Sequence, residues 1–210
     1  MQNPIKPGSY IVIEGNIGAG KTSLAQMMSV KFNTELILES FAENTFLPQF
    51  YKQPDRFAFP LEMSFMAERY RQLTELFSNR KPERSIISDY YFGKCLLFSK
   101  VNLKSDEFKL YSEFFELLES RIPKPDLVVF LKKEVDVLQS NIAKRGRSFE
   151  RGIARTYLEA LNTAYEGLMD ELSRNSILTI TIDTNSLDFL NDPLAYNRLL
   201  TLISNQLKGC

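Results

Sequence analysis

The sequence contains no histidine and only two cysteines among its 210 residues. Without histidine there is no Ser-His or Cys-His catalytic pair, and two cysteines cannot complete a zinc site of the usual four ligands. Cys95 and Cys210 lie far apart in the chain, which suits a reducing compartment better than a disulfide-stabilised fold. These absences exclude histidine-based nucleophiles and a cysteine/histidine zinc site of the usual ligand count.

The sequence also lacks an excess of charge and a long apolar run. Lys+Arg and Asp+Glu both number 26, so general affinity for nucleic acid or for an anionic membrane is not expected. The first ten residues contain no apolar signal region, and no run approaches the ~20 apolar residues that span a bilayer. We expect a cytoplasmic protein whose residues 1–210 form one domain.

Five short and nearly continuous apolar runs predict strands that are buried on both faces. They occupy residues 10–14, 35–38, 85–88, 127–131 and 177–182. Segments with helical spacing lie between and after them, at residues 21–32, 56–78, 105–120, 135–145, 153–172 and 186–207. This alternation predicts an α/β fold with a five-stranded parallel sheet flanked by helices. Ligands of such sheets bind beyond the carboxyl ends of the strands.

Residues 15–22, with the sequence GNIGAGKT, match the P-loop pattern G-x-x-x-x-G-K-[ST] and join a predicted strand to a predicted helix. Glycines let the backbone amides turn toward phosphates, and the start of the helix favours negative charge. Lys21 is expected to reach the β- and γ-phosphates, and the Thr22 hydroxyl to bind Mg²⁺. The expected ATP-binding residues are Gly15, Asn16, Ile17, Gly18, Ala19, Gly20, Lys21, Thr22, Ser23, Arg145 and Asn185.

A P-loop alone does not distinguish GTPases, motor ATPases and small-molecule kinases. The sequence has neither the N-K-x-D motif of signalling GTPases nor a strand that ends in Asp-Glu, as in motor ATPases. It does have an arginine-rich stretch at residues 144–152, between two predicted helices. Such a stretch suits a lid in which Arg145 and Arg147 stabilise a phosphoryl group in transfer.

Three motifs together resemble the deoxyribonucleoside kinases, a family that includes deoxycytidine, deoxyguanosine and deoxyadenosine kinases. They are the P-loop variant, the run Glu83-Arg84-Ser85 followed by Ser88-Asp89, and Arg145-Gly146-Arg147 with Glu150. The resemblance spans about residues 10–189. It implies transfer of the γ-phosphoryl group of ATP to the 5′-hydroxyl of a deoxyribonucleoside, with Mg²⁺, by a homodimer.

The resemblance also implies roles for single residues at the reacting atoms. Glu39 would face the 5′-hydroxyl, Glu83 would lie beside Mg²⁺ or accept the proton, and Arg84 would bridge the 5′ oxygen and the transferred group. The sequence leaves open whether Glu39 or Glu83 is the proton acceptor, and Glu39 is the first choice. Tyr51 and Glu150 would hold the 3′-hydroxyl of the sugar.

The base pocket implied by the resemblance contains Arg69, Asp89 and Glu62. Glu62 stands where the family usually has a glutamine. An ionised carboxylate only accepts hydrogen bonds, which suits the N1–H and 2-amino donors of guanine, whereas a protonated Glu62 would readmit adenine. We therefore expect a purine deoxyribonucleoside, with deoxyadenosine and deoxyguanosine both open.

Two positions depart from the family pattern, and two other functions compete with it. The family's aromatic stacking residue falls at Gly93, where Tyr91 or Phe92 could substitute, and one lid arginine falls near Asn141. A thymidylate-type monophosphate kinase would usually show Asp-Arg-Tyr where this chain has Asp89-Tyr90-Tyr91. A regulatory protein that binds nucleotide without turnover is the other alternative.

Overall fold

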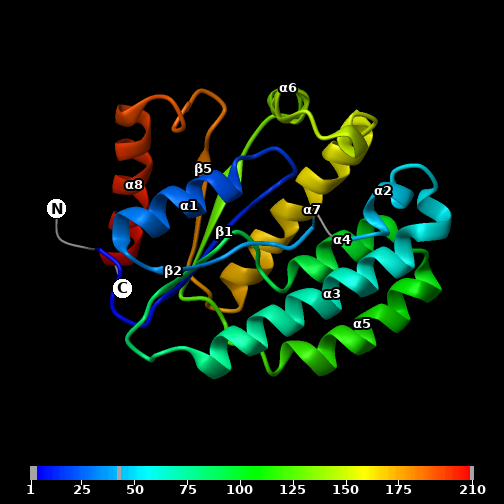
Figure 1. The fold of residues 1–210 in the computed structure, drawn as a ribbon, viewed down its shortest axis with the longest axis horizontal. Coiled ribbons are helices and arrows are strands. Elements are labelled where there is room, and N and C mark those ends of the chain that lie inside the picture. Colours follow the sequence, from blue (N-terminus) through cyan, green and yellow to red (C-terminus); the bar gives the residue numbers. More distant parts are fainter. Residues whose placement is uncertain (1–3, 42–43, 209–210) are drawn as a thin grey trace.

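The computed structural model describes residues 4–41 and 44–208. Its five strands are β1 (Tyr10–Gly15), β2 (Glu35–Ile37), β3 (Ile86–Ser88), β4 (Leu127–Lys132) and β5 (Thr179–Asp183). They pair in parallel in the order β2-β3-β1-β4-β5, which confirms the predicted five-stranded sheet (Figure 1). The carboxyl ends of the strands point toward the side of the molecule that carries α6 (Val135–Arg145) and α2 (Leu47–Phe50).

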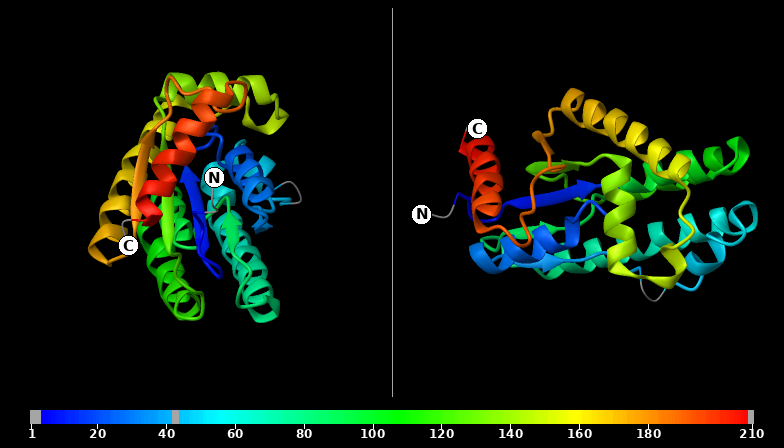
Figure 2. Two further views of the ribbon diagram at one scale, coloured as in Figure 1. Left: turned by 90° about the vertical axis from the view of Figure 1, so that its left-hand side faces the viewer. Right: turned by 90° about the horizontal axis from the view of Figure 1, so that it is seen from above.

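Helices cover both faces of the sheet (Figure 2). Alternate side chains of β1 enter two different cores, because successive residues of a strand point to opposite faces. Ile11 and Ile13 pack with α1 (Lys21–Phe32) and α8 (Pro193–Lys208). Tyr10 and Val12 pack with the long helices α3 (Pro54–Asn79), α5 (Ser105–Glu119) and α7 (Arg155–Arg174).

The helix α4 (Lys94–Asn102) was not predicted from the sequence. It packs against α3, α5 and α7, so apolar residues occur on most of its circumference and the two-sided pattern of a surface helix is missing. The last helix was placed too early in the sequence. It begins at Pro193 and not at residue 186, with proline at its first position, where the missing N–H costs nothing.

Cys95 is a free, buried thiol, and Cys210 lies outside the described residues. None of the helices within residues 4–41 and 44–208 combines the length and the apolar character needed to cross a bilayer.

Candidate active site

The P-loop turns out of β1 into α1 at the carboxyl edge of the sheet. Gly18 and Gly20 have φ angles of 86° and 98°, which side chains other than glycine rarely adopt. A Cβ atom on Gly18 would lie 2.9 Å from the carbonyl oxygen of Leu138, and one on Gly20 would lie 2.9 Å from the ring of Phe189. Both backbone angle and space therefore require glycine at these two positions.

Hydrogen bonds to α6 and α7 fix the P-loop in place. The amide of Asn16 donates to the carbonyl of Leu158 at 2.8 Å, and Asn141 donates to the carbonyl of Gly18 at 2.9 Å. The position near which a lid arginine was expected therefore holds the loop itself. Lys21 lies across the loop, with its ammonium 3.1 Å from the carbonyl oxygen of Asn16.

Asp89 follows β3 and lies beside the first turn of α1. Its Oδ2 accepts from the Thr22 hydroxyl at 2.5 Å, and its Oδ1 accepts from the backbone N–H of Glu39 at 2.7 Å. Within the described residues, no group of three or more His, Cys, Asp or Glu side chains is gathered for a metal. Mg²⁺ in nucleotide sites needs only one or two protein oxygens besides phosphates and waters, and Thr22 with Asp89 fits that donor set.

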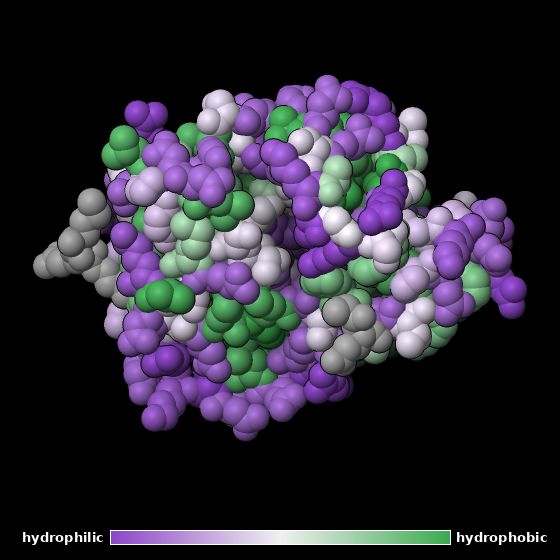
Figure 3. All heavy atoms as spheres, turned by 45° about the horizontal axis from the view of Figure 1, so that its top comes forward, coloured by the Kyte–Doolittle hydropathy of each residue, from purple (hydrophilic) through white to green (hydrophobic). Residues whose placement is uncertain are grey.

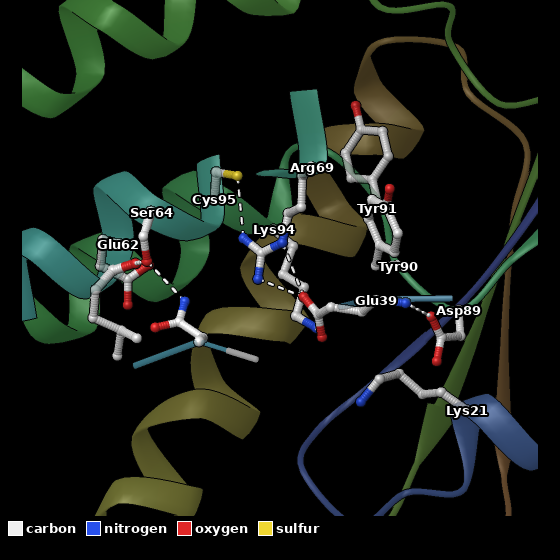
Figure 4. Close-up of polar contacts among 12 residues, drawn as sticks. Lys21, Glu39, Glu62, Ser64, Arg69, Asp89, Tyr90, Tyr91, Lys94 and Cys95 are labelled. Atoms are coloured by element: carbon white, nitrogen blue, oxygen red, sulfur yellow. Dashed lines mark hydrogen bonds and ion pairs between the residues drawn. The ribbon is translucent and has the colours of Figure 1, made fainter. Parts of the chain in front are cut away.

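Glu39, just beyond β2, is held by two buried cations (Figure 4). Its Oε1 accepts from Arg69 Nη2 at 2.6 Å and from Arg69 Nε at 2.9 Å, and its Oε2 accepts from Lys94 Nζ at 2.9 Å. Burial alone would raise the pKa of Glu39, but Lys94 and Arg69 outweigh it and hold the pKa well below its usual range. Glu39 is therefore an ionised hydrogen-bond acceptor at physiological pH.

Glu62, on α3, accepts fewer hydrogen bonds than Glu39 and has no ion-pair partner among the described residues. It is 1% exposed, and its Oε1 accepts from the amide of Asn102, at the end of α4, at 2.7 Å. Its Oε2 is buried and has no partner among the described residues. Burial raises the pKa of Glu62 to about 7, against the opposing effect of Arg69 and of the Asn102 hydrogen bond. The structure thus presents one free acceptor atom inside an apolar wall.

The lid expected at residues 144–152 closes on the same region. Arg145 donates to Glu150 Oε2 through Nε at 3.0 Å and Nη2 at 2.5 Å, and Arg147 donates to Glu150 Oε1 at 3.2 Å. Tyr51 stacks on Phe149 with a centroid distance of 6.3 Å. Burial, with Glu150 nearby, raises the pKa of Tyr51 well above its usual value.

These groups surround one cavity of about 780 Å³, including its open mouth. The space-filling view shows a recess near the centre of the molecule with hydrophilic residues around it (Figure 3). The polar residues of the cavity are Lys21, Thr22, Glu39, Tyr51, Glu62, Arg69, Asp89, Lys94, Asn102, Arg145, Arg147, Glu150 and Tyr157. Its apolar walls include Phe41, Phe50, Leu61, Phe65 and Phe98.

A second cavity adjoins the P-loop from the side of α6. Residues Gly18, Ala19, Gly20, Lys21, Thr22 and Ser23 line it, together with Lys133, Arg145 and Asn185. Lys21, Thr22 and Arg145 thus border both cavities. The arrangement suits a donor nucleotide on one side of the P-loop lysine and an acceptor on the other.

The structure does not bring Glu83 and Arg84 to this site, which corrects the catalytic and metal-binding roles expected of them. Both precede β3, whose first residue Ile86 pairs with Tyr10 at the start of β1. They are exposed at the amino end of the parallel sheet, the end opposite the P-loop, and Arg84 borders a separate surface groove. Asp89 occupies the place beside Thr22 that was expected for Glu83.

Two expectations for the base pocket also need correction. Asp89 lies with Thr22 at the phosphate end and not with Glu62. Tyr91 and Phe92 do not substitute for an aromatic residue at Gly93, because both belong to the core beneath the sheet. Phe98, one helical turn after Lys94, supplies the aromatic ring that α4 places in the cavity.

Sequence reasoning missed Lys94 and Asn102. Both lie on α4, at its first and last residue, and that helix was not predicted. A lysine within an otherwise buried segment was the available signal for Lys94. No local signal marked Asn102.

Comparison with known proteins identifies the family of this chain. The model of the deoxynucleoside kinase family matches residues 11–208. The chain belongs to the deoxynucleoside kinase family. It is an ATP-dependent kinase, which confirms the resemblance inferred from the P-loop and the lid.

Curated relatives and solved structures of similar proteins match nearly all of the length of this kinase. Deoxyguanosine kinase of Bacillus subtilis (strain 168) is 35% identical, with 90% of this chain and 93% of the relative covered. Deoxyadenosine kinase of Lactobacillus acidophilus is 30% identical, with 94% and 96% covered. A structure of deoxyadenosine kinase from M. mycoides with dCMP and dCDP bound has a TM-score of 0.81 and 27% identity, with 96% and 100% covered.

Proposed function

We propose that this kinase transfers the γ-phosphoryl group of ATP to the 5′-hydroxyl of a purine deoxyribonucleoside and prefers deoxyguanosine. The observation that carries the base preference is the free, buried Oε2 atom of Glu62 beside the Asn102 amide. Guanine presents two adjacent donors, N1–H and the 2-amino group, to such a carboxylate, whereas adenine needs a donor in return. The curated deoxyguanosine kinase relative supports the same preference.

The chemistry at the other end of the cavity follows from its charges. Lys21 would contact the β- and γ-phosphates, and Thr22 with Asp89 would hold Mg²⁺, which would supply positive charge that stabilises the phosphates. Glu39 would accept the hydrogen bond of the 5′-hydroxyl and orient it toward the γ-phosphorus. Because phosphoryl transfer has a loose transition state, this orientation matters more than the strength of the base.

The lid and the sugar contacts complete the proposal. Arg145 and Arg147 would give up some of their hydrogen bonds to Glu150 and bind the phosphates instead. Tyr51 and Glu150 would then hold the 3′-hydroxyl of the sugar. Residues 144–152 would act as the lid of a single kinase domain that comprises residues 1–210. A homodimer in the cytoplasm, expected from the sequence, belongs to the same proposal.

A substrate panel tests the base preference. Deoxyguanosine, deoxyadenosine, deoxycytidine, thymidine and their ribose counterparts are supplied with ATP and Mg²⁺, and ADP release is measured for the wild type and for Glu62→Gln. We expect deoxyguanosine to give the highest kcat/KM, and Glu62→Gln to lower the ratio of deoxyguanosine to deoxyadenosine by ~10- to 100-fold. An unchanged ratio in Glu62→Gln would contradict the role of Glu62.

A further inference from the structure

Lys94 is a buried lysine at the first residue of α4. It is 3% exposed, and within the described residues its one hydrogen bond goes to Glu39. Its ammonium also lies 5.3 Å from the centroid of the Phe98 ring. A lysine ammonium has three donors, so this side chain retains hydrogen-bonding capacity toward the cavity that it lines.

Opposing effects act on the positive charge of Lys94, and the nearby carboxylates prevail. The start of a helix carries a partial positive charge, and the cations of Arg69 and Lys21 lie close by. Burial together with Lys94 lowers the pKa of Lys21 to about 8. Burial alone would likewise lower the pKa of Lys94, but Glu39 and Glu14 outweigh it and raise that pKa, so Lys94 stays protonated.

Glu39 does not need Lys94 to be neutralised or oriented. Arg69 already supplies two hydrogen bonds and a full positive charge, and its guanidinium is fixed between Cys95 Sγ at 3.1 Å and the ring of Phe65 at 4.9 Å. At this end of the cavity, the cations of Lys21, Arg69 and Lys94 lie beside the carboxylates of Glu39 and Asp89, and the buried carboxylate of Glu14 also acts on Lys21 and Lys94. The ammonium of Lys94, which keeps donors after its bond to Glu39, is therefore positioned for an anion that arrives with the substrates.

We propose that Lys94 is a catalytic residue, whose ammonium contacts the phosphoryl group as it passes from ATP to the nucleoside that Glu39 holds. Burial at the first residue of α4 and the contact with the Phe98 ring keep the ammonium beside the reacting atoms even without the charge of Glu39, and the long lysine side chain lets it follow the moving group. This role rests on the proposed function. The 5′ oxygen forms a bond to the γ-phosphorus while the bond from that phosphorus to the β–γ bridging oxygen breaks. The hydroxyl proton passes by way of Glu39 to water, and Lys94 keeps its own proton.

The first experiment removes the charge and keeps the length of the side chain. Lys94→Met is expected to lower kcat by ~10²- to 10³-fold, the loss usual for one donor that stabilises transition-state charge, with KM for the nucleoside changed less than fivefold. Lys100→Met is the matched control, because Lys100 is an exposed lysine on the same helix and should retain wild-type kcat. A Lys94→Met kcat within threefold of the wild type would overturn the proposal.

A double-mutant cycle separates this role from a merely structural one. If Lys94 acts only by orienting Glu39, Lys94→Met should cost nothing more in a Glu39→Gln background. If its ammonium contacts the phosphoryl group, kcat should fall at least another tenfold in that background. No further fall contradicts the proposal. Lys94→Gln replaces Lys94→Met in both measurements if the methionine variant does not fold by thermal melting.

The wild type measured in the same assay separates a failure of the proposed function from a failure of the role of Lys94. A wild-type enzyme that phosphorylates no deoxynucleoside would sink the proposed function itself. Activity in the wild type with an unaffected Lys94→Met variant would sink only the role of Lys94. Lys94→Arg, which keeps the charge in a bulkier group, should recover part of the kcat lost in Lys94→Met.

Discussion

Two glutamates of the same cavity, Glu39 with a side chain 15% exposed and Glu62 at 1%, are largely shielded from water, and yet their pKa values shift in opposite directions. Glu39 receives three hydrogen bonds from Arg69 and Lys94, whereas Glu62 receives one, from the neutral amide of Asn102. The pKa of Glu39 is well below its usual range, and that of Glu62 is raised to about 7. Burial is common to both, so the charges of the neighbouring side chains decide the ionisation state.

The difference separates two tasks within one small cavity. Glu39 remains ionised throughout the physiological range and offers a constant acceptor at the reacting end. Glu62 can be a carboxylate or a carboxylic acid near neutral pH, so its hydrogen-bonding pattern at the other end depends on conditions. A comparison of the two residues by mutation and pH therefore tests both assignments.

The largest expected effect is at Glu39. Glu39→Gln should lower kcat by ~10²- to 10³-fold, because the amide removes the anion that orients the 5′-hydroxyl. It also leaves Arg69 and Lys94 without their shared partner, which should lower the free energy of unfolding by about 3 kcal/mol. Steady-state kinetics and chemical denaturation measure the two effects. Glu35→Gln, at the first residue of β2, is the control, and a Glu39→Gln kcat within threefold of the wild type would refute the role of Glu39.

The next effect concerns pH. Glu62 is protonated below its pKa of about 7 and ionised above it, so the preference for deoxyguanosine over deoxyadenosine should rise as pH rises through 7. We expect the ratio of the two kcat/KM values to increase by about tenfold between pH 6 and pH 8. Titration of Lys21 affects both substrates alike and cancels in the ratio. The groups that act on Glu62 do not titrate in this range: Arg69, Lys94 and Glu39 stay charged, and Asn102 stays neutral. A ratio independent of pH in the wild type, or a pH-dependent ratio in Glu62→Gln, would contradict this account.

A smaller effect is expected at Asn102. The amide hydrogen bond lowers the pKa of Glu62, so Asn102→Leu, which keeps the volume and removes the donor, should raise it. The midpoint of the deoxyguanosine preference should then move upward by about one pH unit. The same pH series of kcat/KM ratios measures the shift. A midpoint that moves downward would show that Asn102 does not stabilise the ionised form.

The smallest effect is expected at Glu83 and Arg84. Both are exposed at the amino end of the sheet, so Glu83→Gln and Arg84→Ala should keep kcat/KM within about twofold of the wild type. Kinetics with deoxyguanosine and ATP provide the check. A hundredfold loss in either variant would restore the role expected from the sequence and would add a third glutamate to the comparison.

The sequence predicted the sheet and the phosphate end well, because their signals are local. Each strand is one apolar run, and the P-loop is defined by eight consecutive residues. Glu39 was placed correctly because it follows a strand. Glu83 and Arg84 were misplaced because the motif Glu83-Arg84-Ser85 was aligned with the family without knowledge of where β3 begins. The strand begins after both residues, at Ile86.

The base end was less predictable because its contacts join distant parts of the chain. Glu62 and Asn102 are 40 residues apart, and Glu39 and Lys94 are 55 apart. Periodicity does not reveal such pairs. The balance between the two glutamates depends on them, so the opposite pKa shifts could be seen only once α3 and α4 were packed together.

The helix α4 has a consequence for the size of the acceptor. Lys94, its first residue, meets the reacting end of the cavity, and Asn102, its last, meets the base-reading end. Eight residue steps of 1.5 Å make the distance along this helix about 12 Å. The length of this single helix thus sets the distance between the hydroxyl that is phosphorylated and the edge of the base that is recognised. Acceptors whose hydroxyl lies too near to or too far from the base would miss one end, so α4 acts as a gauge of molecular length in addition to its two contacts.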